Sequence, residues 1–82
     1  MADKALILEY LRSEIDRALR TLNNRERDII KAFFGINQTE MTLEEIGDKF
    51  GLTRERVRQI KEKAIRHLRQ NTKNKLLKTY LG

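Results

Sequence analysis

The chain has 82 residues, no cysteine and a formal net charge of +6, so it suits one small domain and leaves no room for a second. The absence of cysteine excludes disulfide bonds, thiolate nucleophiles and thiolate zinc sites. Apolar runs last only a few residues, as at residues 5–8, so we expect neither a membrane span nor a signal peptide. These features predict one soluble domain over residues 1–82.

The absence of proline and the scarcity of glycine favour helix throughout, and we expect an all-α fold of about five helices. The first is predicted from about residue 3 to residue 21, with apolar side chains at spacings of three and four: Leu8, Leu11, Ile15, Leu19 and Leu22. The second follows a cap made by Asn23 and Glu26 and ends at Gly35. A short polar loop over residues 36–41 comes next.

Two helices joined by a tight turn are predicted over about residues 42–69. Thr42 and Glu45 form a T-x-x-E capping box, whereas Thr53 caps the second helix without one. Gly51 supplies the positive φ that the turn needs, and Gly47 removes a side chain where the second helix approaches. The apolar positions that complete this helix-turn-helix pattern are Leu43, Ile46, Phe50, Leu52, Val57 and Ile60.

The second motif helix is expected to continue until Asn71 and Thr72 interrupt it, before a last short helix around Leu76, Leu77, Tyr80 and Leu81. This part of the chain is strongly basic. Residues 1–53 hold eight Lys and Arg against ten Asp and Glu, whereas residues 54–82 hold ten bases against two acids. Such a division indicates a polyanionic partner, because each neutralised phosphate releases condensed counterions. A merely solvated basic face is the alternative.

A helical wheel divides the second motif helix into a core face and an outer face. The core face holds Val57, Ile60, Ala64 and Leu68, and the outer face holds Glu55, Gln59, Glu62 and Arg66. Base edges are normally reached from the first turns of such a helix, so the expected base readers are Arg54, Glu55, Arg58 and Gln59. Arg can bridge guanine O6 and N7, Gln can pair with adenine, and Glu can accept from cytosine N4. For Glu55, an intrahelical pair with Arg58 or Gln59 is the alternative.

The segment TLEEIGDKFGLTRERVRQIKEKAIRHLR, residues 42–69, resembles region 4 of primary bacterial sigma factors, the promoter-recognition subunits of RNA polymerase. The resemblance extends back through LNNRERDIIKAFFGI at residues 22–36 and forward to Leu81, and its TRERVRQI core is highly specific. Phe33 departs from the family pattern, since many relatives have a base there, and Lys61-Glu62 replaces an acid-first order. Because the family's larger preceding domains are missing, we interpret the chain as one domain excised from a longer protein.

The resemblance implies recognition of the upstream promoter hexamer in the major groove during transcription initiation, with Arg54, Glu55, Arg58 and Gln59 at the bases. It implies DNA-backbone contacts by Arg25, Thr42, Leu43, Thr53, Arg56 and Lys63. It further implies docking of the polymerase β-subunit flap and of regulators at Phe34, Ile65, Arg66, Leu68 and Arg69. The implied partners are promoter DNA, RNA polymerase core, activators and anti-sigma factors. A monomer in the bacterial cytoplasm, at the nucleoid, with no cofactor or metal is expected.

Two other interpretations stay open. A stand-alone regulator that dimerises on a palindrome would need an exposed apolar patch, for which Leu6, Leu77 and Tyr80 are available, although we expect them to be buried within the monomer. A protein-docking module would use the Phe34 region and contact DNA little.

Catalysis is not expected. His67 stands between charged neighbours, and no Ser/His set, acid pair or metal-ligand cluster accompanies it in the sequence. The three phenylalanines, Phe33, Phe34 and Phe50, have helical spacing and are predicted to pack in the core rather than to stack on single-stranded bases.

Overall fold

The computed structural model describes the backbone of residues 4–81 and the side chains there other than those of Ile7, Leu8 and Tyr80. Five helices follow one another: α1 (Lys4–Leu19), α2 (Asn24–Phe34), α3 (Leu43–Phe50), α4 (Arg54–Asn71) and α5 (Lys75–Leu81). No strand occurs within residues 4–81, so the all-α prediction is confirmed. The expected start at residue 3, and the predicted packing of Leu8 and Tyr80, lie outside what the structure describes.

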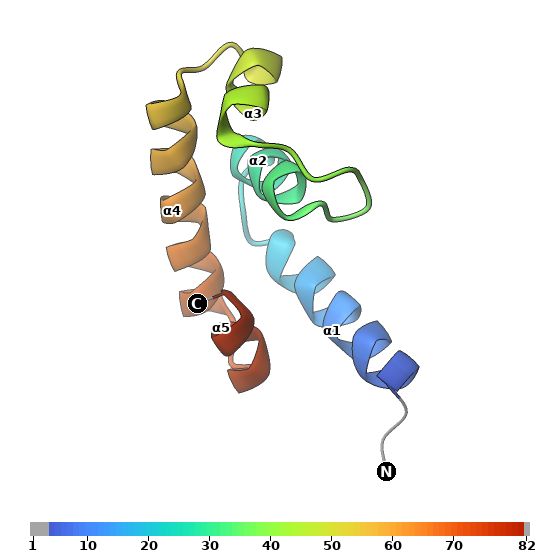
Figure 1. The fold of residues 1–82 in the computed structure, drawn as a ribbon. Helices are drawn as coiled ribbons and strands as arrows, with labels where there is room; N and C mark the ends of the chain where they lie inside the picture. The colour runs from blue at the N-terminus through green and yellow to red at the C-terminus, as the bar shows by residue number, and fades with distance from the viewer. Residues whose placement is uncertain (1–3, 82) are drawn as a thin grey trace.

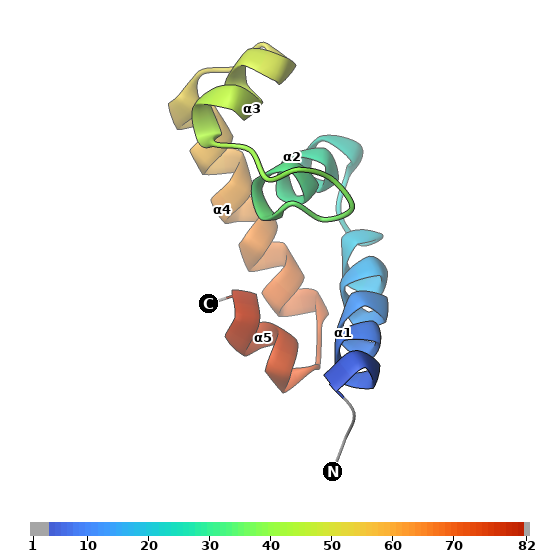
Figure 2. The same cartoon turned by 45° about the vertical axis from the view of Figure 1, so that its right-hand side comes forward.

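Helix α4 is the central helix of the fold, because it contacts each of the other four helices. Helix α3 crosses it at one end and α1 and α5 lie along its other end, with α2 between the two groups (Figures 1 and 2). The resulting shape is elongated, with extents of 45 × 25 × 19 Å. No helix in the described part of the chain is long and apolar enough to cross a bilayer.

The first helix ends at Leu19, two residues earlier than predicted. The amide and the hydroxyl of Thr21 both donate to the carbonyl oxygen of Ala18, at 3.0 and 2.6 Å, and close a turn instead of a further helical step. Arg27 then reaches back from α2 and donates to the carbonyl oxygens of Leu19 and Leu22. These bonds satisfy carbonyls that the end of α1 leaves without helical partners, and they fix the junction with α2.

Both capping boxes are present as predicted. Asn23 Oδ1 accepts from the Glu26 amide at 2.8 Å while Glu26 Oε1 accepts from the Asn23 amide at 3.3 Å. Thr42 and Glu45 form the same reciprocal pair at the start of α3. Gly35 ends α2 in the left-handed conformation, with φ of +67°, also as predicted.

Two clusters of buried side chains make up the core. The motif cluster joins α2, α3 and the first half of α4 through Ile29, Ala32, Ile46, Val57 and Ile60. The terminal cluster joins α1, α5 and the second half of α4 through Ala18, Leu19, Leu22, Ile30, Ala64, Leu68 and Leu77. Phe33 and Phe50 pack against the motif cluster and Phe34 against the terminal cluster, as the core interpretation predicted.

One burial prediction is wrong and one is confirmed. Leu77 is 1% exposed, but Leu6 is 63% exposed. Leu6 lies in the first turn of α1 and belongs to neither buried cluster. Tyr10 and Leu76 are exposed as well.

Candidate nucleic-acid interface

The turn between α3 and α4 sets the angle at which α4 leaves the domain. Gly51 has φ of +70° and caps α3, and a Cβ added there would meet nothing within 4 Å. Gly47 has the opposite requirement, because a Cβ there would lie 2.5 Å from the carbonyl oxygen of Leu52. The absence of a side chain at Gly47 therefore makes room for the backbone of the turn. The sequence pattern had suggested instead that it makes room for the second helix. The Leu52 amide donates to the Gly47 carbonyl oxygen at 2.9 Å and closes this arrangement.

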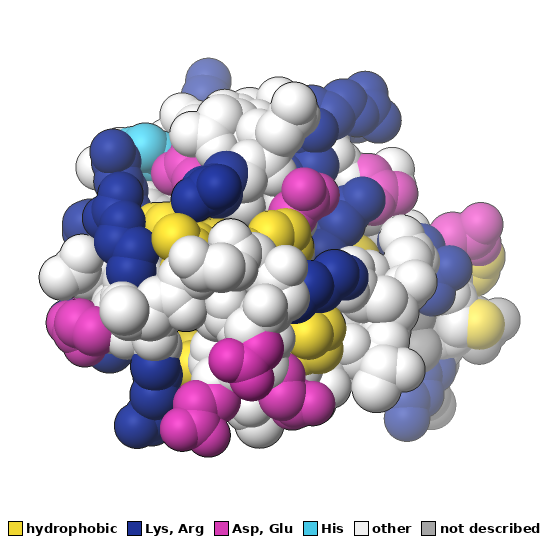
Figure 3. Space-filling view, turned by 90° about the horizontal axis from the view of Figure 1, so that it is seen from above, with side chains coloured by type: hydrophobic (Ala, Val, Ile, Leu, Met, Phe, Trp, Pro, Cys, Tyr) yellow, Lys and Arg dark blue, Asp and Glu magenta, His cyan; other side chains and the backbone are white. Residues whose placement is uncertain are grey.

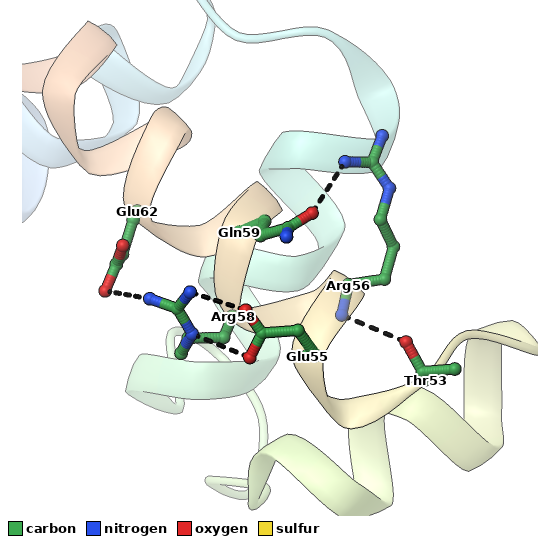
Figure 4. A network of polar contacts seen from close by, with 6 residues as sticks. All are labelled: Thr53, Glu55, Arg56, Arg58, Gln59 and Glu62. Atoms are coloured by element: carbon green, nitrogen blue, oxygen red, sulfur yellow. Dashed lines mark hydrogen bonds and ion pairs between the residues drawn. The ribbon is translucent and has the colours of Figure 1, made fainter.

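The amino-terminal turns of α4 present the predicted base readers. Arg54, Glu55 and Gln59 are exposed and Arg58 is partly exposed, whereas Val57 and Ile60 point into the motif cluster. The wheel-based division of this helix is therefore confirmed for these positions. Thr53 begins the helix, and its Oγ1 accepts from the Arg56 amide at 3.1 Å (Figure 4).

These side chains also contact one another. Arg58 Nε and Nη2 donate to the two carboxylate oxygens of Glu55, and Arg58 Nη1 lies 2.9 Å from Glu62 Oε1 (Figure 4). Arg56 Nη1 donates to Gln59 Oε1 at 3.4 Å. The structure thus contains the intrahelical Glu55–Arg58 pair that the sequence left as an alternative to base reading.

The contact between Glu55 and Arg58 shifts the pKa of both side chains. The hydrogen bond from Arg58 lowers the pKa of Glu55 below its ordinary value, and the two carboxylates raise the pKa of Arg58 above its ordinary value. Because the pKa of Glu55 is depressed in the folded state, the pair is present at neutral pH and is lost only as the pH falls through that lowered pKa.

The residues expected along the DNA backbone fall into two groups. Arg25, Arg56 and Lys63 line one hollow of about 150 Å³ between the amino-terminal end of α2 and α4, together with Asn23, Glu26, Gln59 and Ile60. Thr42 and Thr53 instead cap α3 and α4, where free amides and the helix dipole favour an anion. Leu43 begins α3 and is half-buried against the motif cluster.

The residues expected at a docking surface differ in accessibility. Arg66 and Arg69 are exposed and Phe34 and Ile65 are half-buried, but Leu68 is only 3% exposed. Phe34 and Leu68 line one apolar cavity of about 40 Å³ together with Leu77 and Leu81 of α5. Leu68 therefore supports this surface from beneath and is not itself exposed on it.

Sequence reasoning missed two contacts between helices. Glu26 is 7% exposed, and its Oε2 lies 3.2 Å from Nδ1 of His67 on α4, without hydrogen-bond geometry. Lys61 Nζ lies 4.7 Å from the ring centroid of Phe33, a cation–π contact between α2 and α4. Neither pair has a signal in the sequence, because the partners are distant along the chain.

Seen from the end that carries α3, Lys and Arg side chains line the left side and also lie at the centre and the upper right, whereas Asp and Glu side chains are most numerous along the lower edge (Figure 3). Within residues 4–81, no group of three or more His, Cys, Asp or Glu side chains is placed to hold a metal ion.

Comparisons with known proteins agree with this geometry. The family described as Sigma-70, region 4 matches residues 18–70. RNA polymerase sigma factor SigA1 of Synechococcus elongatus is 47% identical over 72 residues, which cover 87% of this chain and 18% of the relative. SigA of Listeria monocytogenes is 43% identical over 74 residues, 89% of this chain and 20% of that protein. RNA polymerase sigma factor sigB of Arabidopsis thaliana is 41% identical over 81 residues, 98% of this chain and 14% of the relative.

The chain thus spans no more than a fifth of the length of these relatives. The family match includes the α2 capping box, both glycines of the turn and nearly all of α4, so it covers the elements that build the candidate interface. This chain belongs to the sigma-70 region 4 family.

Proposed function

We propose that this domain recognises the upstream element of bacterial promoters by placing the amino-terminal turns of α4 in the major groove. The observation that carries this proposal is the joint placement of three exposed readers and a hollow lined by three bases. Arg54, Glu55 and Gln59 lie exposed at the start of α4, and Arg25, Arg56 and Lys63 line the hollow beside them. A helix that enters the groove needs both, because base contacts specify the sequence and phosphate contacts fix the register.

The chemistry of the readers suits a mixed sequence. Arg54 can bridge guanine O6 and N7, and Gln59 can pair with adenine N6 and N7. Glu55 can accept from cytosine N4, and an acid in this position would repel the backbone of any duplex that offers no such donor. The domain therefore gains discrimination, and not merely affinity, from this turn of α4.

We infer further that the domain works as part of a longer sigma factor, with RNA polymerase core as its partner. The relatives that it matches are named as RNA polymerase sigma factors, and the chain corresponds to a fifth or less of each. In this proposal Phe34 and Ile65, with Arg66 and Arg69 at the rim, receive the flap of the polymerase β subunit or regulators. Support comes from the apolar cavity below Phe34, whose lining belongs to the terminal cluster and not to the DNA side.

The DNA proposal is tested by fluorescence anisotropy with a duplex carrying TTGACA, the hexamer that the resemblance implies, and a scrambled duplex. We expect tighter binding to the hexamer, and each of Arg54→Ala and Gln59→Ala should reduce this preference by about 1–3 kcal/mol. Arg25→Ala should weaken binding to both duplexes equally and lower the salt slope by about one.

Lys78→Ala is the matched control for Arg25→Ala, because it removes the same charge from an exposed position on α5. It should leave the salt slope close to that of the wild type. Equal, salt-sensitive binding of both duplexes by the wild type would contradict base reading of this hexamer and leave a basic surface only.

The docking proposal is tested separately with a purified β-flap fragment. Arg66→Glu and Ile65→Ala should weaken flap binding while hexamer preference is kept, because these residues lie in the second half of α4. Sedimentation at several concentrations checks the monomer, and a dimer formed through the exposed Leu6 or Leu76 would contradict it. Flap binding that is unchanged in both variants would remove this surface from the proposal.

A further inference from the structure

Arg58 is held on the surface of α4 by acids on both sides of it. Glu55 lies one turn before it and accepts from both Nε and Nη2, whereas Glu62 lies one turn after it and approaches Nη1 at 2.9 Å (Figure 4). The three side chains are between 42% and 61% exposed, so they form this arrangement on the surface that is proposed to face DNA. All three guanidinium nitrogens thus face these carboxylates.

We propose that Glu62 is a specificity-determining positioning residue, which keeps the Arg58 guanidinium along the helix and away from DNA phosphates. This inference rests on the proposed function, since it names how the same face of α4 limits binding to wrong sequences. A cation strengthens binding to every duplex when it neutralises a phosphate. Two carboxylates around Arg58 already neutralise its charge, so its contribution to such nonspecific binding is small.

Glu62 occupies the one nitrogen of Arg58 that Glu55 leaves open. Glu55 accepts from Nε and Nη2, so without Glu62 the Nη1 edge is free to turn toward a phosphate. On the hexamer the base contacts fix the register of α4, whereas on a scrambled duplex α4 is free to shift until Nη1 meets a phosphate, so the loss of Glu62 strengthens mainly the wrong complex. Arg56, in contrast, donates to the neutral amide of Gln59 and keeps its full charge for the phosphate hollow that it lines.

The test is Glu62→Gln, measured by anisotropy on the TTGACA and scrambled duplexes over a range of salt concentrations. We expect binding to the scrambled duplex to become about threefold tighter and the preference for the hexamer to fall by about the same factor. The salt slope should steepen by about one, as for one added phosphate contact. Thermal unfolding of the variant checks that the fold is unchanged.

Two controls distinguish an effect that acts through the Glu62–Arg58 contact from the general effect of removing one negative charge. Glu44→Gln removes one exposed carboxylate from α3 and should give less than half of the gain. In an Arg58→Ala background, Glu62→Gln should have no further effect, because its action passes through Arg58.

An equal gain in the Arg58→Ala background, a gain matched by Glu44→Gln, or an unchanged salt slope would each overturn the proposal. Failure of the proposed function gives a different result. In that case the wild type shows no hexamer preference, while the salt slopes of the wild type, Glu62→Gln and the double variant on any duplex still decide whether Glu62 restrains Arg58.

Discussion

The two ends of this molecule are stabilised in different ways. At the α3 end, Thr42 and Thr53 cap α3 and α4, and the Leu52 amide donates to the Gly47 carbonyl oxygen across the turn. These local bonds define where α4 begins. At the other end, α1 and α5 are held mainly by the terminal cluster, which encloses a cavity of about 40 Å³. The end proposed to read DNA therefore has its helix starts and its turn fixed by local bonds in addition to the motif cluster, whereas the end proposed to meet a protein is held mainly by packing between distant segments.

The largest expected difference between the ends comes from truncating one core side chain in each. Ile46→Ala in the motif cluster should cost about 2–5 kcal/mol of unfolding free energy and weaken DNA binding, because Ile46 is fully buried between α3 and α4. Leu77→Ala in the terminal cluster should cost less, near the lower end of that range, since α5 can shift into the adjoining cavity.

Chemical denaturation and anisotropy on the hexamer duplex measure both effects. Leu77→Ala should retain DNA binding at temperatures where it is folded. If this variant lost binding as strongly as Ile46→Ala, the two ends would not be independent and the comparison would fail.

The glycines of the turn should respond to alanine for different reasons. Gly47→Ala should cost about 1–3 kcal/mol, because its Cβ would lie 2.5 Å from a backbone carbonyl oxygen and the turn would have to shift. Gly51→Ala should cost about 1–2 kcal/mol from its φ of +70° without any clash. Urea denaturation gives both values, and only Gly47→Ala should also reduce hexamer preference. Loss of preference in Gly51→Ala would contradict the assignment of the clash to Gly47.

The caps should have smaller effects. Thr53→Ala should cost about 1 kcal/mol, since the Arg56 amide loses its acceptor at the start of α4. Thr53→Ser keeps the hydroxyl and serves as the matched control, with stability close to the wild type. Comparison of the two by thermal unfolding tests the cap directly, and equal losses would place the effect of Thr53 in its methyl group instead.

The smallest expected effect concerns the contact between α2 and α4 at Phe33. Lys61→Gln removes the cation from the ring and should cost about 0.5 kcal/mol, as is usual for such contacts near the surface. In a Phe33→Leu background the same change should cost nothing, which a double-mutant cycle in urea measures. An undiminished loss in that background would mean that Lys61 acts elsewhere.

Much of the recognition helix was predictable because its determinants lie close together in the sequence. The T-x-x-E box at Thr42, the cap at Thr53 and the left-handed glycine at position 51 each act within four residues, and the structure contains all three. The spacing between Arg58 and Glu62 is also local and permitted an ion pair, but several partners were available to Arg58. Only the structure shows that Arg58 contacts both Glu55 and Glu62.

By itself, then, the sequence determined the helices, their caps, the turn and the uneven charge, because these depend on neighbouring residues and on composition. The tertiary structure decided which distant residues meet. It placed Arg25 in one hollow with Arg56 and Lys63, set Glu26 beside His67 and left Leu6 exposed. The physical reason is that burial and long-range contacts follow from how helices pack on one another, which the periodicity of a single helix does not specify.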